Sequence, residues 1–412
     1  MKYIVIVLLA CVSLFSGCAT TTEGGYTVGP RGGAEDIATG SPVEITTQQL
    51  SVLVPVFLPN IPKNTDDYAK EGVWPELRRA ESNRFAVQLR NAISSKDSFG
   101  AVRVSPDDSA TAHLYVQGKI LESTGEDISL LISVTDISGK RLMRKTYKHR
   151  VSEYVFEDPR NKGVDVYQPI FDKVANDLVK LSKRINSKQI SKISGIEEMR
   201  FAESFSPEYF SKYLSTSSKS RGVHELSKKR SSRTKLLGFP ADTDSMLQRV
   251  RSLRVKDQMF IDNIQIDYDD FKIAMNEHYT VWQKQSFYES KAAREAQAEA
   301  SAQMLVGILA IAAGAALASD SNSSAGYYSG VAIAAAGVGT IADGFQTSKD
   351  SKAHRESLNE MGRSLNIQLA PNVIEMEDRT IELTGTASEQ YTSWRKYLRE
   401  IYLSEKTPEI IL

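Results

Sequence analysis

Histidines and clustered aspartates are the side chains of this sequence that could bind a metal or transfer protons. No two of the five histidines fall at a metal-ligand spacing: His113, His149, His224, His278 and His354. Four aspartates between 262 and 270 lack the glycine and terminal glutamate of a calcium loop, so we interpret them as a solvated helix face. Nucleophile-elbow, phosphate-loop and dinucleotide motifs are also missing from the sequence. We therefore assign no catalytic residue, no metal ligand and no cofactor, and expect that the protein is not an enzyme.

Cys18 is the one residue whose surroundings indicate a covalent modification. Met1 and Lys2 precede an apolar run that is too short to span a bilayer, which is typical of a secretory signal. The run ends in Leu14-Phe15-Ser16-Gly17-Cys18, which resembles the lipobox of bacterial lipoproteins. The resemblance implies that residues 1–17 are a signal peptide and that Cys18 carries acyl chains. Because Ala19 follows the cysteine, it also implies an anchor in the outer membrane, on the periplasmic face. The alternative is an ordinary signal peptide or a short membrane anchor, with Cys18 incidental.

Composition limits the remaining possibilities. With 41% hydrophobic and 25% charged residues, the chain suits two or three globular domains. Its 51 basic and 51 acidic side chains cancel, so the chain as a whole does not attract nucleic acid, and an export signal also conflicts with a nucleic acid partner. Two cysteines are too few for a disulfide framework.

A small α/β sandwich is predicted for residues 48–190, after a flexible tether at 18–47. Apolar or alternating runs predict strands at 51–57, 101–104, 113–121, 128–136 and 142–151. Helical periodicity predicts a helix at 75–94 and a closing helix at 167–185. The order is therefore strand, helix, strand and meander, which suits a two-layer α/β domain.

This order of elements resembles the periplasmic domain of the curli-export channel lipoproteins and of the lipoproteins that activate penicillin-binding proteins. The resemblance rests on Val52 to Phe57, the helix from Glu81 to Ile93, Val116 to Ile120 and the hairpin from Leu130 to Lys148. It implies a non-catalytic domain that binds other proteins or its own copies, which would make residues 48–190 a docking domain.

Residues 191–243 contain a basic, serine-rich stretch, which we interpret as a linker with an exposed loop from Ser211 to Lys235. A solvated loop explains this composition. Contact with an anionic surface is the alternative, since clustered cations attract such surfaces at short range. The candidate contacts are Lys228, Lys229, Arg230 and Arg233.

Residues 244–367 are predicted to form a long helical hairpin with an apolar tip at 300–342. Its arms would run from Val281 to Ser319 and from Tyr328 to Ile367, and within the tip only Asp320 is charged. Glycines seven residues apart lie on one helix face and allow two backbones to approach closely: Gly307 and Gly314, then Gly330, Gly337 and Gly344. The tip could insert in a bilayer, or it could pack in a soluble oligomer.

Residues 368–412 are predicted to form a β-hairpin and a helix with an aromatic face. The whole chain is thus expected to be α+β. The leading functional hypothesis is a self-assembling outer-membrane lipoprotein of an envelope assembly or export apparatus, a homo-oligomer with envelope proteins as partners. The alternative is a monomeric periplasmic scaffold or activator of a cell-wall enzyme or envelope machine.

Overall fold

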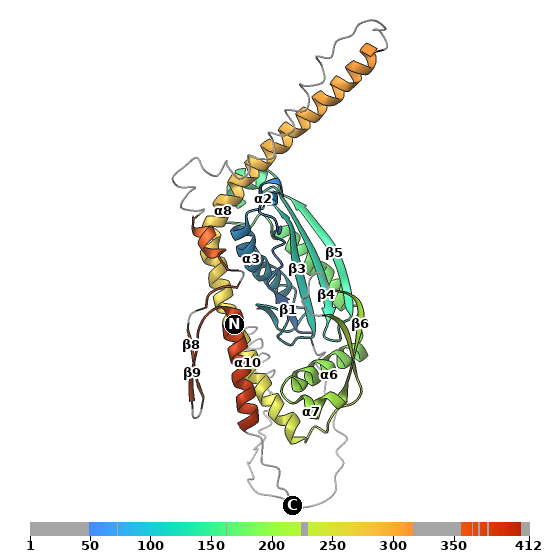
Figure 1. Cartoon of the computed structure of the whole chain (residues 1–412), viewed down its shortest axis with the longest axis vertical. Coiled ribbons are helices and arrows are strands. Elements are labelled where there is room, and N and C mark those ends of the chain that lie inside the picture. The colour runs from blue at the N-terminus through green and yellow to red at the C-terminus, as the bar shows by residue number, and fades with distance from the viewer. Residues whose placement is uncertain are drawn as a thin grey trace, which may run out of the picture. The chain divides into compact units, whose positions relative to one another are not determined.

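A mixed five-stranded sheet forms the centre of the first domain (Figure 1). The structure is a computed structural model, which describes residues 49–315 and 356–404 except residues 72, 162, 224–229, 365, 370 and 377–378. The strand order is β2-β1-β3-β4-β5, with β1 parallel to both of its neighbours and the others antiparallel. The strands are β1 (Val52–Pro55), β2 (Val102–Ser105), β3 (Leu114–Ser123), β4 (Asp127–Asp136) and β5 (Arg141–Arg150). The predicted strand, helix, strand and meander order is confirmed.

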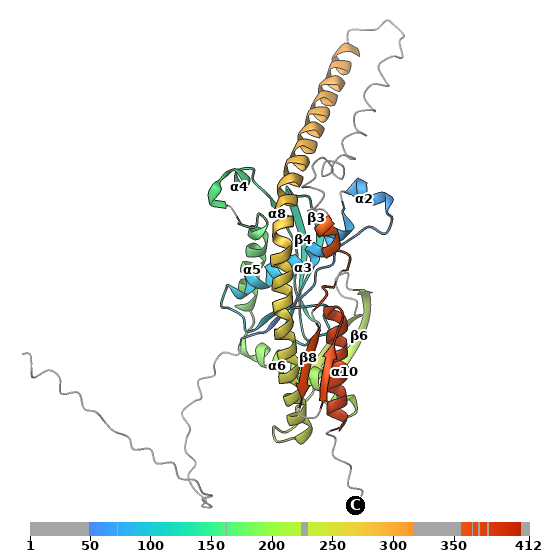
Figure 2. The same ribbon diagram turned by 90° about the vertical axis from the view of Figure 1, so that its left-hand side faces the viewer.

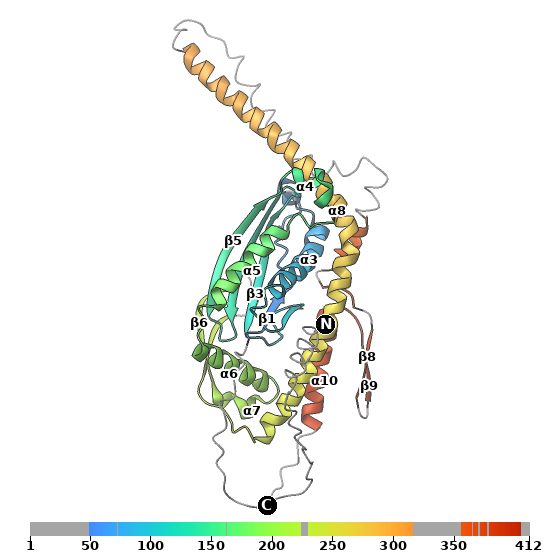
Figure 3. The same ribbon diagram turned by 180° about the vertical axis from the view of Figure 1, so that it is seen from behind.

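Two helices cover one face of this sheet, α3 (Pro75–Ser94) and α5 (Gln168–Ser182) (Figure 3). Phe85 of α3 is completely buried, with its ring centroid 5.6 Å from that of Phe171 and 6.1 Å from that of Tyr167. β4 is buried at every position from Ile128 to Val134, and the apolar row that belongs to the common core lies at alternate positions: Ile128, Leu130, Ile132 and Val134. Shorter elements lie in the connections: α2 (Asp66–Glu71), α4 (Tyr154–Glu157) and η1 (Pro159–Asn161).

The described residues of the stretch at 191–243, which are 191–223 and 230–243, are folded, which differs from the predicted linker. It contains most of α6 (Ser187–Glu203), then α7 (Pro207–Phe210), η2 (Ser211–Tyr213), β6 (Leu214–Val223) and β7 (Arg230–Leu236). Apolar residues of α6 enter the same core as the sheet, among them Ile196 and Met199. The expected loop is instead an antiparallel pair of strands, and the Thr234 N–H donates to the Ser138 carbonyl at the β4–β5 turn. Serine and lysine suit an exposed strand pair as well as a loop, so composition alone could not separate the two.

One uninterrupted helix, α8 (Ser245–Ala315), contains the first predicted arm as far as Ala315 and begins well before Val281. It packs against the sheet domain through Phe260, Ile264, Tyr268 and Met275, all of which are buried. Beyond Arg294, the described side chains Glu295, Ala296 and Ala298 are exposed. The first predicted arm is therefore the end of a helix whose earlier part belongs to the core.

The chain returns to the sheet domain after residue 355. Residues 356–361 are helical, so within the described residues the second arm ends at Met361 and does not continue to Ile367. The backbone approaches α3 closely at the next residue, since a Cβ on Gly362 would lie 1.8 Å from the Glu76 carbonyl oxygen. Leu358 is completely buried, and Trp74 donates a hydrogen bond to Asn359.

The predicted C-terminal hairpin and helix are present as β8 (Asn372–Met376), β9 (Arg379–Leu383) and α10 (Ala387–Ser404). The aromatic face of α10 packs on α8, where Phe260 stacks on Tyr391 and on Trp394. Tyr391 and Trp394 are therefore buried in a contact within the molecule. Together these elements make the fold α+β, as expected.

Candidate functional site

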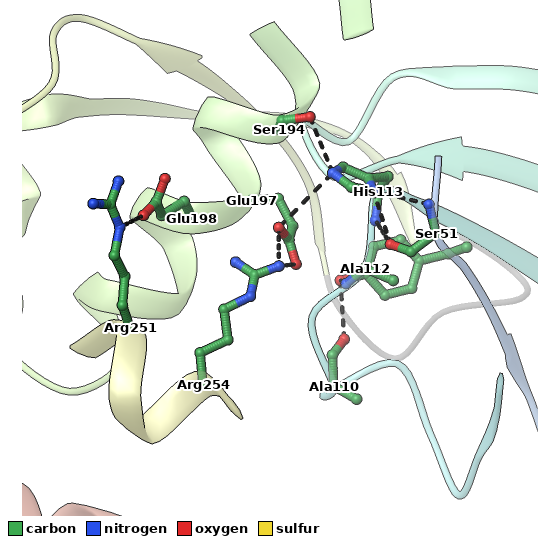
Figure 4. Close-up of polar contacts among 10 residues, drawn as sticks. Ser51, Ala110, Ala112, His113, Ser194, Glu197, Glu198, Arg251 and Arg254 are labelled. Atoms are coloured by element: carbon green, nitrogen blue, oxygen red, sulfur yellow. Dashed lines mark hydrogen bonds and ion pairs between the residues drawn. The ribbon is translucent and has the colours of Figure 1, made fainter. Parts of the chain in front are cut away.

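Five polar residues from four elements meet where α8 crosses the end of the sheet, and we call them the junction cluster (Figure 4). Its members are Ser51, His113, Ser194, Glu197 and Arg254. Ser51 and His113 directly precede the parallel strands β1 and β3, while α6 contributes Ser194 and Glu197 and α8 contributes Arg254. The cluster therefore joins the sheet to the two helices that follow it.

Hydrogen bonds fix the protonation state of His113 in this arrangement. The Ser51 N–H donates to Nδ1 of His113 over 2.9 Å, so Nδ1 must carry a lone pair and the ring is neutral. The proton then sits on Nε2, which lies 3.1 Å from the Ser194 hydroxyl and 3.9 Å from a Glu197 carboxylate oxygen. Burial lowers the pKa of His113, Glu197 opposes this shift, and Arg254 adds to it.

Glu197 is held by an almost fully desolvated ion pair. Its side chain is 3% exposed, and both carboxylate oxygens accept hydrogen bonds from Arg254, which is 21% exposed. The neighbouring pair, Arg251 and Glu198, connects the same two helices at exposures of 35% and 22%. The two adjacent pairs thus differ in their access to water, and Arg251 also pairs with the exposed Asp242.

A second buried network joins α3 to α8 further along the helix. Glu81 accepts hydrogen bonds from Ser123 at 2.6 Å and from Tyr279 at 2.7 Å, and its burial raises its pKa although Arg78 acts against this. Arg84 donates to Asp165 at 2.6 Å and to Asn276 at 2.9 Å. Polar groups in low dielectric need such partners, so the network fixes how α8 lies on α3.

Further polar contacts follow α8 along the sheet domain. The Gln265 amide donates to the Val104 carbonyl and accepts from the Val104 N–H, which closes the free edge of β2. Beyond it, Lys291 pairs with Glu153 and Arg294 with Glu126. Ordered contacts therefore accompany α8 up to the point where its side chains become exposed.

These clusters offer little room for a substrate. The cavity beside the junction cluster measures about 10 Å³, close to the space of one water molecule. An open hollow of about 600 Å³ lies between β9 and α10, but its lining contains no histidine or cysteine. Within the described residues, no three His, Cys, Asp or Glu side chains group as metal ligands. The arrangement suits a fixed connection between elements.

The structure describes only part of the predicted site residues. Gly307 and Gly314 lie in α8, and Arg230 and Arg233 lie in β7, where Arg233 is exposed. Residues outside the described part are Cys18, Lys228, Lys229, Gly330, Gly337 and Gly344. No helix in the described ranges combines the length and apolar character needed to cross a membrane. The contacts predicted among these residues therefore remain predictions.

The sequence did not predict the junction cluster, because its five residues are spread along the chain from position 51 to position 254 and only the fold brings them together. One pattern in the sequence could have indicated the two ion pairs. Two adjacent acids, Glu197 and Glu198, and two arginines one helical turn apart, Arg251 and Arg254, can pair when their helices lie side by side. Only the fold shows which acid is buried.

Replacing His113 with glutamine should reduce the acid sensitivity of the fold. The unfolded chain binds this proton near the ordinary pKa of 6.5, and the folded chain only at lower pH. The stability linked to His113 is therefore full above pH 6.5 and decreases as the pH falls below it. Urea unfolding at pH 7.5 and 5.5 should show a smaller loss in the variant. An equal loss in both proteins would contradict a neutral buried His113.

In comparisons with known proteins, no family model, no curated protein and no solved structure matches this chain.

Proposed function

We propose that this chain is a lipid-anchored envelope protein that self-assembles, with an α/β domain that docks proteins and a helical hairpin for membrane insertion or packing between subunits. Cys18 would carry the acyl chains that hold it in the outer membrane. The junction cluster and the network around Glu81 would keep the hairpin in a fixed position on the docking domain. No catalytic step is part of this proposal.

The observation that carries the proposal is an excursion of the chain between two attached points. α8 is fastened to the domain up to Arg294 and continues as a helix to Ala315, and the chain is attached again at Leu358. At the rise of an α-helix, residues 295–315 extend about 30 Å. Residues 316–355 connect this helix to the second attached point, and they include most of the apolar sequence 300–342. This path supports a hairpin.

A glycine substitution in the tip tests self-assembly. A carboxylate on the small-residue face would prevent close helix packing, so Gly337→Glu should convert a detergent-extracted oligomer into a smaller species. Size can be measured by light scattering coupled to gel filtration. Gly238→Glu is a matched control, because Gly238 is exposed and an added Cβ there meets only Tyr213 at 3.7 Å. An oligomer of unchanged size in Gly337→Glu would contradict the proposal.

Removing the acylated sulfur tests the anchor separately. The Cys18→Ser chain cannot be acylated, so we expect it to leave the outer-membrane fraction unless the hairpin holds it there. A Cys18→Ser protein that stays monomeric in solution without detergent would favour the monomeric scaffold over the self-assembling protein.

A further inference from the structure

The outer face of α8 carries a stripe of large apolar side chains that nothing in the described structure covers. Val255, Met259, Ile266 and Ile273 are 57%, 62%, 65% and 70% exposed. Large apolar side chains this exposed at regular spacing are typical of an interaction surface. We call these four residues the α8 stripe. The outer side of α8 faces the viewer in Figure 2.

The spacing places the stripe on one line along the helix. Met259, Ile266 and Ile273 are seven residues apart, and Val255 precedes Met259 by four. At about 100° per residue, all four fall within an arc of about 40°. The buried residues Phe260, Ile264, Tyr268 and Met275 lie on the opposite side of α8. A seven-residue apolar repeat is the pattern by which one helix packs on another.

We propose that the α8 stripe binds the α8 stripe of a second copy of this chain, with the two helices antiparallel around a two-fold axis at Ile266. This specifies a contact for the self-assembly proposed above, and it depends on that proposal. Ile273 of one copy then meets Met259 of the other, because both lie seven residues from the axis. A two-fold contact uses one surface twice, and Met259, Ile266 and Ile273 are symmetric about this axis, whereas Val255 falls opposite Glu277 of the other copy.

Charge complementarity selects the antiparallel second copy. Lys256 lies on one flank of the stripe and Glu277 at the stripe's edge on the same side, ten residues before and eleven residues after Ile266. Antiparallel packing brings Lys256 of each copy to within about one residue rise of Glu277 of the other. Neither side chain has an ion pair within the part of the chain that the structure describes.

The polar residues closer to Ile266 in the sequence also fit the antiparallel arrangement. Asp270 and Asn263 are exposed and lie four and three residues from Ile266, so each Asp270 would face an Asn263 amide of the other copy. On the other flank, Asp262 is already paired with Arg103 and Asp269 with Arg90. Parallel packing would instead place Asp270 and Glu277 beside their own counterparts, which like charges disfavour.

Cysteine cross-linking in the full-length protein tests both contact and direction. Ile266→Cys should form a disulfide-linked dimer on mild oxidation, because the two positions meet at the axis. Met259→Cys and Ile273→Cys should each cross-link weakly alone and efficiently when mixed. Equal homodimer formation by all three variants would indicate parallel packing and overturn the arrangement. The unsubstituted chain provides the blank for Cys11 and Cys18.

Charge exchange gives a second readout that keeps the fold intact. Lys256→Glu and Glu277→Lys should each weaken dimerisation, and the double variant should restore it. Ile266→Glu should raise the dimer dissociation constant by about tenfold or more. Leu237→Glu, at a position 64% exposed, is the matched control and should leave dimerisation unchanged.

The two assembly contacts can fail independently. If Ile266→Cys cross-links in the Gly337→Glu background, the α8 contact stands even when the hairpin contact does not. If no variant of the α8 stripe changes association while Gly337→Glu abolishes it, the inference is wrong and the proposed function remains. A wild-type protein that stays monomeric at every concentration in detergent would contradict both.

Discussion

Replacing Arg254 with methionine is expected to lower the free energy of unfolding by about 3 kcal/mol. The methionine keeps most of the aliphatic volume but removes the guanidinium that pairs with Glu197. That carboxylate is 3% exposed and would remain buried without its main partner, because His113 is neutral and 3.9 Å away. Urea unfolding at pH 7.5 measures the loss.

The adjacent ion pair provides the control. Arg251→Met removes the partner of Glu198 between the same two helices, but water reaches both side chains, so we expect a change of about 1 kcal/mol or less. The double variant Arg254→Met, Glu197→Met should recover most of the lost stability, since it removes the uncompensated charge as well. Equal losses in Arg254→Met and Arg251→Met would show that burial does not distinguish the two pairs.

The fixed position of α8 matters for the proposed function because this one helix carries the polar contacts to the domain, the α8 stripe and the start of the apolar sequence. The junction cluster and the Glu81 network lie on its inner side, the α8 stripe lies on its outer side, and its end enters the apolar sequence. A contact at the stripe would therefore set the position of two hairpins relative to each other. Acyl anchors would favour that contact by confining the copies to one membrane.

Local sequence patterns predicted the elements whose partners are close in the chain. The alternation from Leu130 to Lys148 and the Ser138-Gly139 turn specify a hairpin, and both are present. The aromatic spacing in α10 likewise identified buried side chains, because one face of a helix must pack.

The features that the sequence did not predict depend on contacts between residues that are far apart in the chain. Exposed Ile266 and Ile273 alternate with buried Tyr268 and Met275, so α8 has apolar residues on two sides. Its sequence periodicity does not show which side packs against the rest of the protein. The return of the chain at Gly362 depends on the Glu76 backbone, far away in the sequence. No local rule indicates either feature, because both are set by how the helices are placed on the sheet.

Two glycines in the same backbone conformation allow the position of α8 to be tested directly. Gly125, in the β3–β4 turn, has φ of 83°, and Gly163 has φ of 85°. An alanine at either position would have to adopt a positive φ, which destabilises the folded state by about 1 kcal/mol. Only at Gly125 would the new Cβ also meet α8, at 2.7 Å from the Phe287 backbone nitrogen, whereas nothing lies within 4 Å at Gly163.

Gly125→Ala should therefore destabilise the protein by about 1–3 kcal/mol more than Gly163→Ala, because backbone atoms of α8 cannot move aside as a flexible side chain can. Urea unfolding of the two variants measures this difference. Hydrogen exchange should show faster opening of α8 around residues 283–291 in Gly125→Ala only, since the turn contacts the helix there through Gln283, Ser286 and Phe287. Similar stabilities and similar exchange in both variants would mean that α8 does not pack on this turn. The proposed hairpin would then lack this attachment to the α/β domain.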